Sequence, residues 1–181
     1  MLIRAESSML LVVDVQDRLA KAVPEGERVI ENCAWLMEIA TKLSVPILVS
    51  EQYPDGLGHT VARLAKLVEK NAVVEKVHFS CAAAPSCRER IKELGRPQIM
   101  IAGMESHVCV LQSALELGHA GYNVFVVADA VASIHAGDRD LAFKRLRDEG
   151  VRLVSRSMVA FEWLHKADSE MFRDISLHYL R

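Results

Sequence analysis

Short, nearly continuous apolar runs alternate with longer helical stretches along the whole chain, and this alternation restricts the fold more than any other feature. Runs of this kind are typical of strands buried on both faces, which occur in parallel sheets covered by helices. We therefore predict an α/β protein with three layers: a mainly parallel, Rossmann-like sheet of six strands with helices on both faces. The expected strands are residues 9–15, 45–50, 71–77, 97–103, 123–129 and 151–155.

The stretches between these runs have helical character, and glycine or proline closes most of the units. No linker, repeat or low-complexity segment interrupts the 181 residues, so we expect a single domain over residues 1–181. The expected helices span residues 27–43, 59–70, 86–94, 106–120 and 138–150, followed by an amphipathic tail from residue 160.

The composition excludes several classes of protein. Apolar residues make up 51% of the chain and charged residues 25%, which suits a large buried core and not a disordered chain. A net charge of -2 gives no general attraction for nucleic acid or for an anionic membrane, so we expect neither as a partner. The first apolar run is far too short to span a bilayer. The four cysteines show no CxxC pair and no zinc-ligand spacing, so we expect free thiols and a cytoplasmic protein.

Chemically active residues follow three of the predicted strands. In sheets of this class, ligands bind beyond the carboxyl ends of the strands. The first strand ends near Asp14, the third near Lys76, and the stretch GMESHVC after the fourth places Cys109 in the first turn of a helix. Each residue alone has an ordinary structural explanation, namely turn closure, a solvated lysine and a small buried side chain. Together they place an acid, a cation and a thiol at one edge of the sheet.

This combination of residues suits nucleophilic catalysis on a carbonyl group. We expect the positive charge of Lys76 and the start of the helix to lower the pKa of the Cys109 thiol. Asp14 would accept the thiol proton and later return it to a leaving amine. Backbone N–H groups at the same helix start would stabilise the oxyanion that forms.

The chain resembles the isochorismatase-like cysteine hydrolases, which include nicotinamidases, isochorismatases and N-carbamoylsarcosine amidases. The resemblance covers nearly the whole chain and is carried by LLVVDVQ, KVHFSC and GMESHVCVLQSALELGHAGYNVFVVADAV; EQYPDGLGHT and GMESHVCVLQ are most similar to isochorismatase-domain proteins without an assigned activity. It implies that Asp14 is the base, Lys76 its electrostatic partner and Cys109 the nucleophile. It also implies an oxyanion hole formed by the backbone N–H groups of Glu105 and Cys109, and a cis peptide bond at Met104–Glu105.

The chain departs from this family pattern at two places. Nicotinamidases carry an Asp-x-His pattern and a further histidine for a metal after the second strand, where this chain has SEQYPDGLGHT with His59 alone. We therefore expect no metal and no other cofactor. The family commonly has threonine where Ser106 stands, with an acid next, whereas His107 follows here.

Several residues beside the predicted strand ends are candidates for contact with a small-molecule substrate, although packing between subunits is an equally ordinary role for them. The resemblance implies a homo-oligomer, and the tail places apolar residues on one helical face for docking or for subunit contact. The candidates for substrate contact are Gln16, Tyr53, Leu57, Phe79 and His107, and the tail residues are Phe172, Ile175 and Tyr179.

The favoured function is hydrolysis of a small amide-like or related carbonyl substrate through a Cys109 thioester. One alternative is vinyl-ether hydrolysis of the isochorismatase type, led by Asp14. Another is a non-catalytic scaffold that uses EQYPDGLGHT to bind partners. A redox thiol protein is the weakest alternative, because no second cysteine is spaced beside Cys109 in the sequence.

Overall fold

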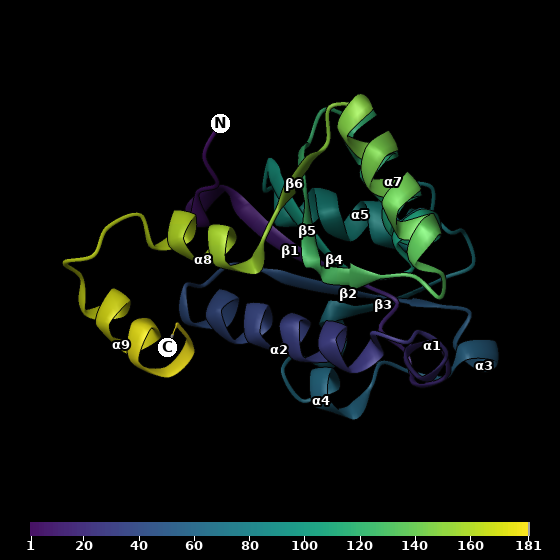
Figure 1. Ribbon diagram of the computed structural model, residues 1–181, viewed down its shortest axis with the longest axis horizontal. Helices are drawn as coiled ribbons and strands as arrows, with labels where there is room; N and C mark the ends of the chain where they lie inside the picture. Colours follow the sequence, from purple (N-terminus) through teal and green to yellow (C-terminus); the bar gives the residue numbers. More distant parts are fainter. Residues whose placement is uncertain (181) are drawn as a thin grey trace.

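A sheet of six strands runs through the centre of the computed structural model, which describes residues 1–180 (Figure 1). Every pair of neighbouring strands is parallel, and the spatial order is β3-β2-β1-β4-β5-β6. The predicted three-layer α/β architecture is confirmed, and the sheet is parallel throughout. The strands are β1 (Ser8–Val13), β2 (Ile47–Gln52), β3 (Val73–Lys76), β4 (Gln98–Met104), β5 (Asn123–Ala132) and β6 (Arg152–Val154).

Helices cover both faces of the sheet (Figure 1). One face carries α2 (Gly26–Lys42), α4 (Ala62–Ala65), α8 (Arg156–Leu164) and α9 (Glu170–Tyr179), and the other carries α5 (Pro85–Leu94), α6 (Leu111–His119) and α7 (Ala136–Asp148). The remaining elements are the 3-10 turns η1 (Ala5–Ser7) and η2 (Lys70–Ala72), the short helices α1 (Asp17–Ala22) and α3 (Pro54–Leu57), and the π-helical turn η3 (Ser106–Val110).

The central strand β1 explains why the apolar runs in the sequence are continuous. All six of its residues are buried. Leu10 and Val12 pack into the core under α2, whereas Leu11 and Val13 pack into the core under α5 and α6. Because both faces are covered, each large apolar side chain contributes about 1.5–3 kcal/mol through burial.

Two segments differ from the sequence-based prediction. The helix expected over residues 59–70 is reduced to the single turn α4, and α1 was not expected. The fifth strand continues to Ala132, past its predicted end at Asp129, and its pairing with β4 shifts register between Ile101 and Gly103. The Asp129 carboxylate accepts a hydrogen bond from the Arg156 N–H at 2.8 Å, so it stabilises the start of α8.

The tail docks on its own chain. Trp163 in α8 and Ile175 in α9 belong to the core cluster beneath α2, and the Trp35 indole donates a hydrogen bond to the Tyr179 carbonyl at 2.9 Å. Figure 1 shows α9 beside one end of α2. The predicted docking therefore occurs within the chain. None of the helices in residues 1–180 is both long and apolar enough to cross a membrane.

The sheet leaves a crevice at the carboxyl ends of β1 and β4, where the connections lead away in opposite directions. At this point β4 approaches β1 closely. Gly103 has φ of +123°, and a Cβ atom there would lie 2.0 Å from the Val13 carbonyl oxygen. Glycine is therefore required immediately before the turn that carries Cys109.

Candidate active site

A buried ion pair joins the carboxyl ends of β1 and β3. The Lys76 Nζ lies 2.8 Å from the Asp14 Oδ2, and neither side chain is exposed to solvent. Asp14 adopts a left-handed backbone conformation with φ of 53°, which aspartate tolerates better than most residues. Burying two charges removes their hydration, and the cost is recovered only where hydrogen bonds satisfy both groups.

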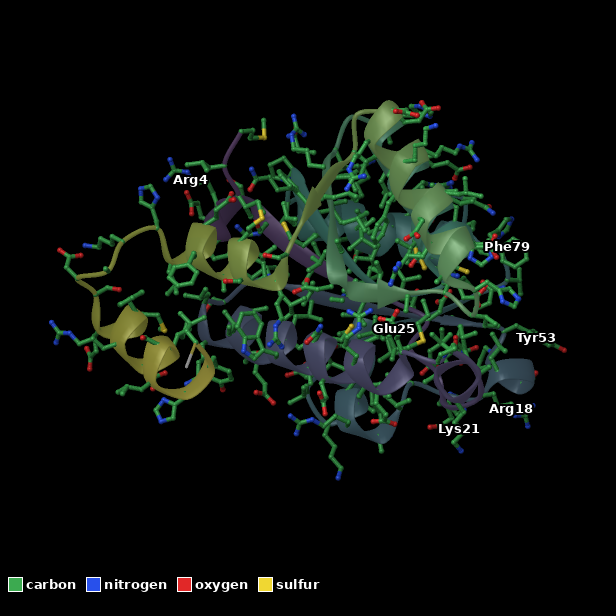
Figure 2. The ribbon with its side chains drawn as sticks, in the orientation of Figure 1. Arg4, Arg18, Lys21, Glu25, Tyr53 and Phe79 are labelled. Carbon is green, nitrogen blue, oxygen red and sulfur yellow. The ribbon has the colours of Figure 1, made fainter. Side chains whose placement is uncertain are left out.

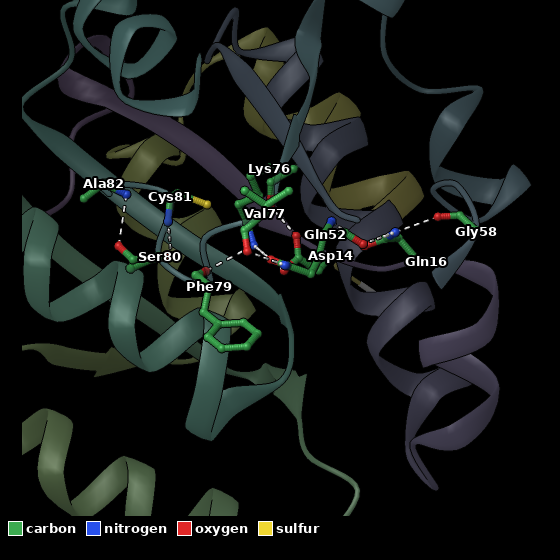
Figure 3. A network of polar contacts seen from close by, with 12 residues as sticks. Asp14, Gln16, Gln52, Gly58, Lys76, Val77, Phe79, Ser80, Cys81 and Ala82 are labelled. Atoms are coloured by element: carbon green, nitrogen blue, oxygen red, sulfur yellow. Dashed lines mark hydrogen bonds and ion pairs between the residues drawn. The ribbon is translucent and has the colours of Figure 1, made fainter. Parts of the chain in front are cut away.

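Lys76 meets this condition with three acceptors. Its ammonium group donates to Asp14 at 2.8 Å, to the Gln52 Oε1 at 2.7 Å and to the Phe79 carbonyl at 3.1 Å (Figure 3). An ammonium group has three donors, so none is left for a substrate. Burial lowers the pKa of Lys76, but the negative charges around it, Asp14 first, outweigh burial and hold the pKa above its usual value. Lys76 is therefore a fixed cation that orients Asp14.

The second oxygen of Asp14 is also held. The Ser50 hydroxyl donates a hydrogen bond to the Asp14 Oδ1 at 2.6 Å, within the buried interior. Burial raises the pKa of Asp14, while the Lys76 charge and the hydrogen bonds from Lys76, Ser50 and Cys109 oppose this effect. A raised pKa makes the carboxylate a better acceptor for a thiol proton.

Ser50 and Gln52 were not predicted as site residues from the sequence. The strand register explains their positions, because Val13, just before Asp14, pairs with Ser50, and Lys76 pairs with Gln52. The sequence does contain a signal for them: both are polar, and they are two residues apart at the carboxyl end of β2. Alternate residues of a strand lie on the same face, so the two side chains could be expected on one side of the sheet.

Cys109 lies in the π-helical turn η3 between β4 and α6. The N–H groups of Val108 and Val110 both donate to the Glu105 carbonyl, at 3.2 and 3.1 Å. π-Helical turns occur frequently at functional sites. Cys109 is 5% exposed and lies in the same pocket lining as Asp14, whose charge acts on the thiol. The Met104–Glu105 peptide bond is cis.

The expectation that the pKa of the Cys109 thiol is lowered overall is wrong, although Lys76 acts on it in the expected direction. Burial, followed by the charge of Asp14, raises the pKa of Cys109, and the positive charge of Lys76 opposes this only in part. The physical reason is that Cys109 is buried and shares its pocket with the Asp14 carboxylate, while the ammonium group is committed to Asp14. The thiol is therefore protonated at rest.

A pocket of about 300 Å³ opens beside Cys109. Of the residues predicted to contact a substrate, Leu57 and Phe79 line it. Figure 2 shows Phe79 and Tyr53 pointing outward at the end of the molecule that carries α1 and α3. The lining consists of four apolar residues, Leu19, Leu57, Phe79 and Val108, and four polar residues, Asp14, Gln52, Glu105 and Cys109.

The other predicted contact residues lie elsewhere. Gln16 is fully buried, and its amide bonds the Gln52 N–H, the Gln52 carbonyl and the Gly58 carbonyl at 2.7, 3.0 and 2.6 Å (Figure 3). It braces the loop after β2 and does not line the pocket. Tyr53 lines a neighbouring cleft of about 510 Å³. His107 lies 3.0 Å from the Ser133 hydroxyl, outside the pocket lining.

A second buried carboxylate fixes the loop that carries Leu57. Glu51 accepts hydrogen bonds from the Thr60 N–H and hydroxyl, both at 2.7 Å, and lies 2.9 Å from the His59 Nδ1. Burial raises the pKa of Glu51, but these hydrogen bonds outweigh it and hold the pKa below its usual range. Among residues 1–180, no three His, Cys, Asp or Glu side chains are grouped as ligands for a metal ion.

Cys109 is the only cysteine in the pocket lining. Cys33, Cys81 and Cys87 are free thiols that are fully buried. Cys81 lies near the site, because its N–H donates to the hydroxyl of Ser113, one helical turn beyond Cys109, at 2.8 Å.

Comparisons with known proteins find a family and relatives that match most of the chain. A model of the isochorismatase domain matches residues 8–158. Isochorismatase family protein 1B of Dictyostelium discoideum is 33% identical over 176 residues, which cover 94% of this chain and 84% of that protein. Isochorismatase domain-containing protein 2A of Mus musculus is 34% identical over 174 residues, which cover 94% of this chain and 81% of that protein.

Two solved structures are similar in fold to nearly the whole chain. The structure described as MAR1 ribonuclease from Caenorhabditis elegans has a TM-score of 0.92 and 32% identity, covering all of this chain and 93% of that chain. YcaC from Escherichia coli, described as an octameric hydrolase of unknown specificity, has a TM-score of 0.92 and covers 99% of this chain and 91% of that chain. At 22% identity, this second likeness shows the fold alone.

Proposed function

The chain belongs to the isochorismatase family of hydrolases, and we propose that it is a cysteine-dependent hydrolase of a small amide-like substrate or a related carbonyl compound. The observation that carries this proposal is the position of the Asp14 carboxylate, which pairs with Lys76 and lines the same pocket as the Cys109 thiol. One carboxylate is thus fixed by a cation with no free donor and shares a pocket with a thiol.

The proposed mechanism has two halves. The Cys109 sulfur attacks the carbonyl carbon while its proton moves to Asp14, giving a tetrahedral oxyanion. Asp14 then protonates the leaving nitrogen, the C–N bond breaks, and the acyl group remains on sulfur as a thioester. Water attacks the thioester with Asp14 as base, and the thiol regains its proton as the acid product leaves.

We assign the oxyanion hole to the backbone N–H groups of Glu105 and Cys109. The first N–H groups of a helical segment lack partners within it, and such groups stabilise the negative charge that develops in acyl transfer. Glu105 immediately precedes η3, Cys109 lies within this single turn, and both residues line the pocket, which supports this assignment.

A thiol and a carboxylate in one pocket lining favour covalent catalysis over vinyl-ether hydrolysis led by Asp14, which needs no nucleophilic sulfur. The Caenorhabditis elegans protein is described as a ribonuclease. A nuclease site needs cations for the phosphates, whereas the pocket lining contains two carboxylates and no lysine, arginine or histidine. We therefore propose no nucleic-acid partner.

We also propose a homo-oligomer in a reducing compartment such as the cytoplasm. Three side chains near the site, Tyr53, Val77 and Phe79, are 56%, 70% and 53% exposed, and a second copy covering them would exclude water. The description of YcaC as octameric adds support. A reducing compartment keeps the nucleophilic thiol free. Size-exclusion chromatography with light scattering tests the assembly.

A substrate screen tests the activity. Small amides, imides and carbamoyl compounds are incubated with the protein, and release of ammonia or amine is measured. Wild type should turn over at least one compound, Cys109→Ala should turn over none, and Cys33→Ala, which changes a buried thiol on the other face of the sheet, should retain activity. Equal turnover by Cys109→Ala would contradict the proposal.

A further inference from the structure

We infer that the pocket beside Cys109 selects electrically neutral substrates, and that the Glu105 side chain excludes anionic ones. This inference rests on the proposed function and extends it to the class of substrate. The substrate is then a neutral amide or related carbonyl compound with a short apolar acyl group, and carboxylate-bearing or phosphorylated compounds are excluded.

The pocket lining is the first observation. Leu19, Leu57, Phe79 and Val108 provide an apolar wall, and Asp14 and Glu105 are the two acidic residues. No lysine, arginine or histidine is among the eight lining residues. An anion placed here would lose hydration without gaining a free counter-charge, and it would meet the carboxylate of Glu105, whereas the charge of Asp14 is paired with Lys76.

The second observation is that the nearby basic side chains already bond other groups of the protein. The three donors of Lys76 are all used within the protein. The Arg18 guanidinium bonds the Gly56 carbonyl on the exposed side of the loop. His107 lies 3.8 Å from both the Glu105 and the Asp138 carboxylates, and its other ring nitrogen contacts Ser133. None of these groups is directed to a ligand in the pocket.

Glu105 is also held in place. Its carboxylate is 14% exposed, and its Oε1 accepts a hydrogen bond from the Ile134 N–H at 3.2 Å. A fixed carboxylate that is largely shielded from solvent repels an anion more strongly than the same group in water. Glutamine at this position keeps an acceptor for Ile134 and removes the charge, so Glu105→Gln is a conservative test.

A pair of alkylating reagents of similar size isolates the charge. Iodoacetamide is neutral and iodoacetate is anionic. In both reactions the Cys109 sulfur displaces iodide, and Asp14 accepts the thiol proton. The rate constant for labelling of the Cys109 peptide is measured by mass spectrometry with each reagent at the same pH. The ratio of the two rate constants, divided by the same ratio for free cysteine, measures selection by charge and cancels general changes in thiol reactivity.

We expect wild type to prefer iodoacetamide at least about tenfold more than free cysteine does, because the Glu105 carboxylate acts on the anion. Glu105→Gln should lower this preference several-fold. Glu116→Gln removes the same charge from an exposed position of α6 and should leave the ratio unchanged.

Each contrary outcome has a distinct meaning. Labelling of Cys109 by iodoacetamide no faster than that of the buried Cys33 would contradict the proposed nucleophile. Rapid labelling with a ratio equal to that of free cysteine would overturn selection by charge and leave the nucleophile intact. A strong preference that persists in Glu105→Gln would overturn the assignment to Glu105.

Discussion

The hydroxyl of Ser50 lies 2.6 Å from the Oδ1 of Asp14, on the opposite side of the carboxylate from Lys76. The two oxygens of the base are therefore fixed by different strands, β2 and β3. This arrangement sets the orientation of the carboxylate toward Cys109 and stabilises its charged form.

Removal of the Ser50 hydroxyl should raise the pKa of Asp14 further, because that hydroxyl lowers it in the wild type. The base acts only when deprotonated, so the acid limb of the profile of kcat/KM against pH should move to higher pH in Ser50→Ala. A shift of about one pH unit or more corresponds to a hydrogen bond with a charged group. Ser50→Thr should restore the wild-type profile.

Ser8→Ala is a matched control for this change. Ser8 is a buried strand serine at the other end of β1, where its hydroxyl contacts Arg4 and Trp163. Its removal should lower stability without moving the acid limb. An equal shift in both variants, or no shift in Ser50→Ala, would show that Ser50 does not act on the base.

Replacement of Lys76 by methionine should destabilise the fold by about 3–5 kcal/mol at neutral pH, because it leaves Asp14 buried without its partner. The pKa of Asp14 would rise further above 3.8, so the folded state would bind more protons than the unfolded state. The variant should therefore lose stability as pH rises from the acid range, and the deficit relative to wild type should shrink on acidification.

Urea unfolding at acid and neutral pH measures this effect. The double variant Asp14→Asn/Lys76→Met should be less destabilised than the sum of the two single changes, because no buried charge remains. Strict additivity would indicate that the two side chains do not interact.

Glu51→Gln should show the opposite dependence on pH. Because the pKa of Glu51 is held below 4.5, its contribution is present above that value and is lost as pH falls through the pKa of the folded state. We expect a loss of about 1–3 kcal/mol at neutral pH that disappears in acid. Glu38→Gln, at a partly exposed ion pair with Arg63, should change stability by less than about 1 kcal/mol. A deficit for Glu51→Gln that persists in acid would contradict this role.

The sequence alone was sufficient to predict the elements that have a strong apolar pattern. Each predicted strand has its counterpart, and the convergence of Asp14, Lys76 and Cys109 follows from their positions after parallel strands. The short length of α4 could not be predicted from a helical pattern. Thr60, just before α4, is held by hydrogen bonds to Glu51, which lies nine residues earlier in the chain.

The electrostatic effects on the pKa values of the site residues could not be predicted from the sequence either. The pKa of the thiol is set by its burial and by the charge of Asp14, which together outweigh the lowering by Lys76. The ammonium group of Lys76 is bonded to Asp14 and not to the thiol. The role of Ser50 depends on strand register, because a shift of one residue would turn its hydroxyl to the other face of the sheet.

The close approach of β4 to β1 gives a prediction for folding. Gly103→Ala should destabilise the protein by about 3 kcal/mol or more, because the new Cβ would meet the Val13 carbonyl at a backbone conformation that alanine rarely adopts. Gly118→Ala in α6 meets nothing within 4 Å and should stabilise by about 0.5–1 kcal/mol. Thermal unfolding of both variants provides the comparison, and equal effects would contradict the close approach.

Acylation of Cys109 is the most direct test of the central claim that this thiol is the nucleophile and Asp14 its base. 4-Nitrophenyl acetate is a neutral, activated acyl donor, and the acetylated peptide is identified by mass spectrometry after rapid quenching. Wild type should carry an acetyl group on Cys109, Asp14→Asn should acquire it far more slowly, and Cys109→Ala should release nitrophenol only at the background rate. Acetylation confined to other residues, or equal release of nitrophenol by Cys109→Ala, would contradict the account.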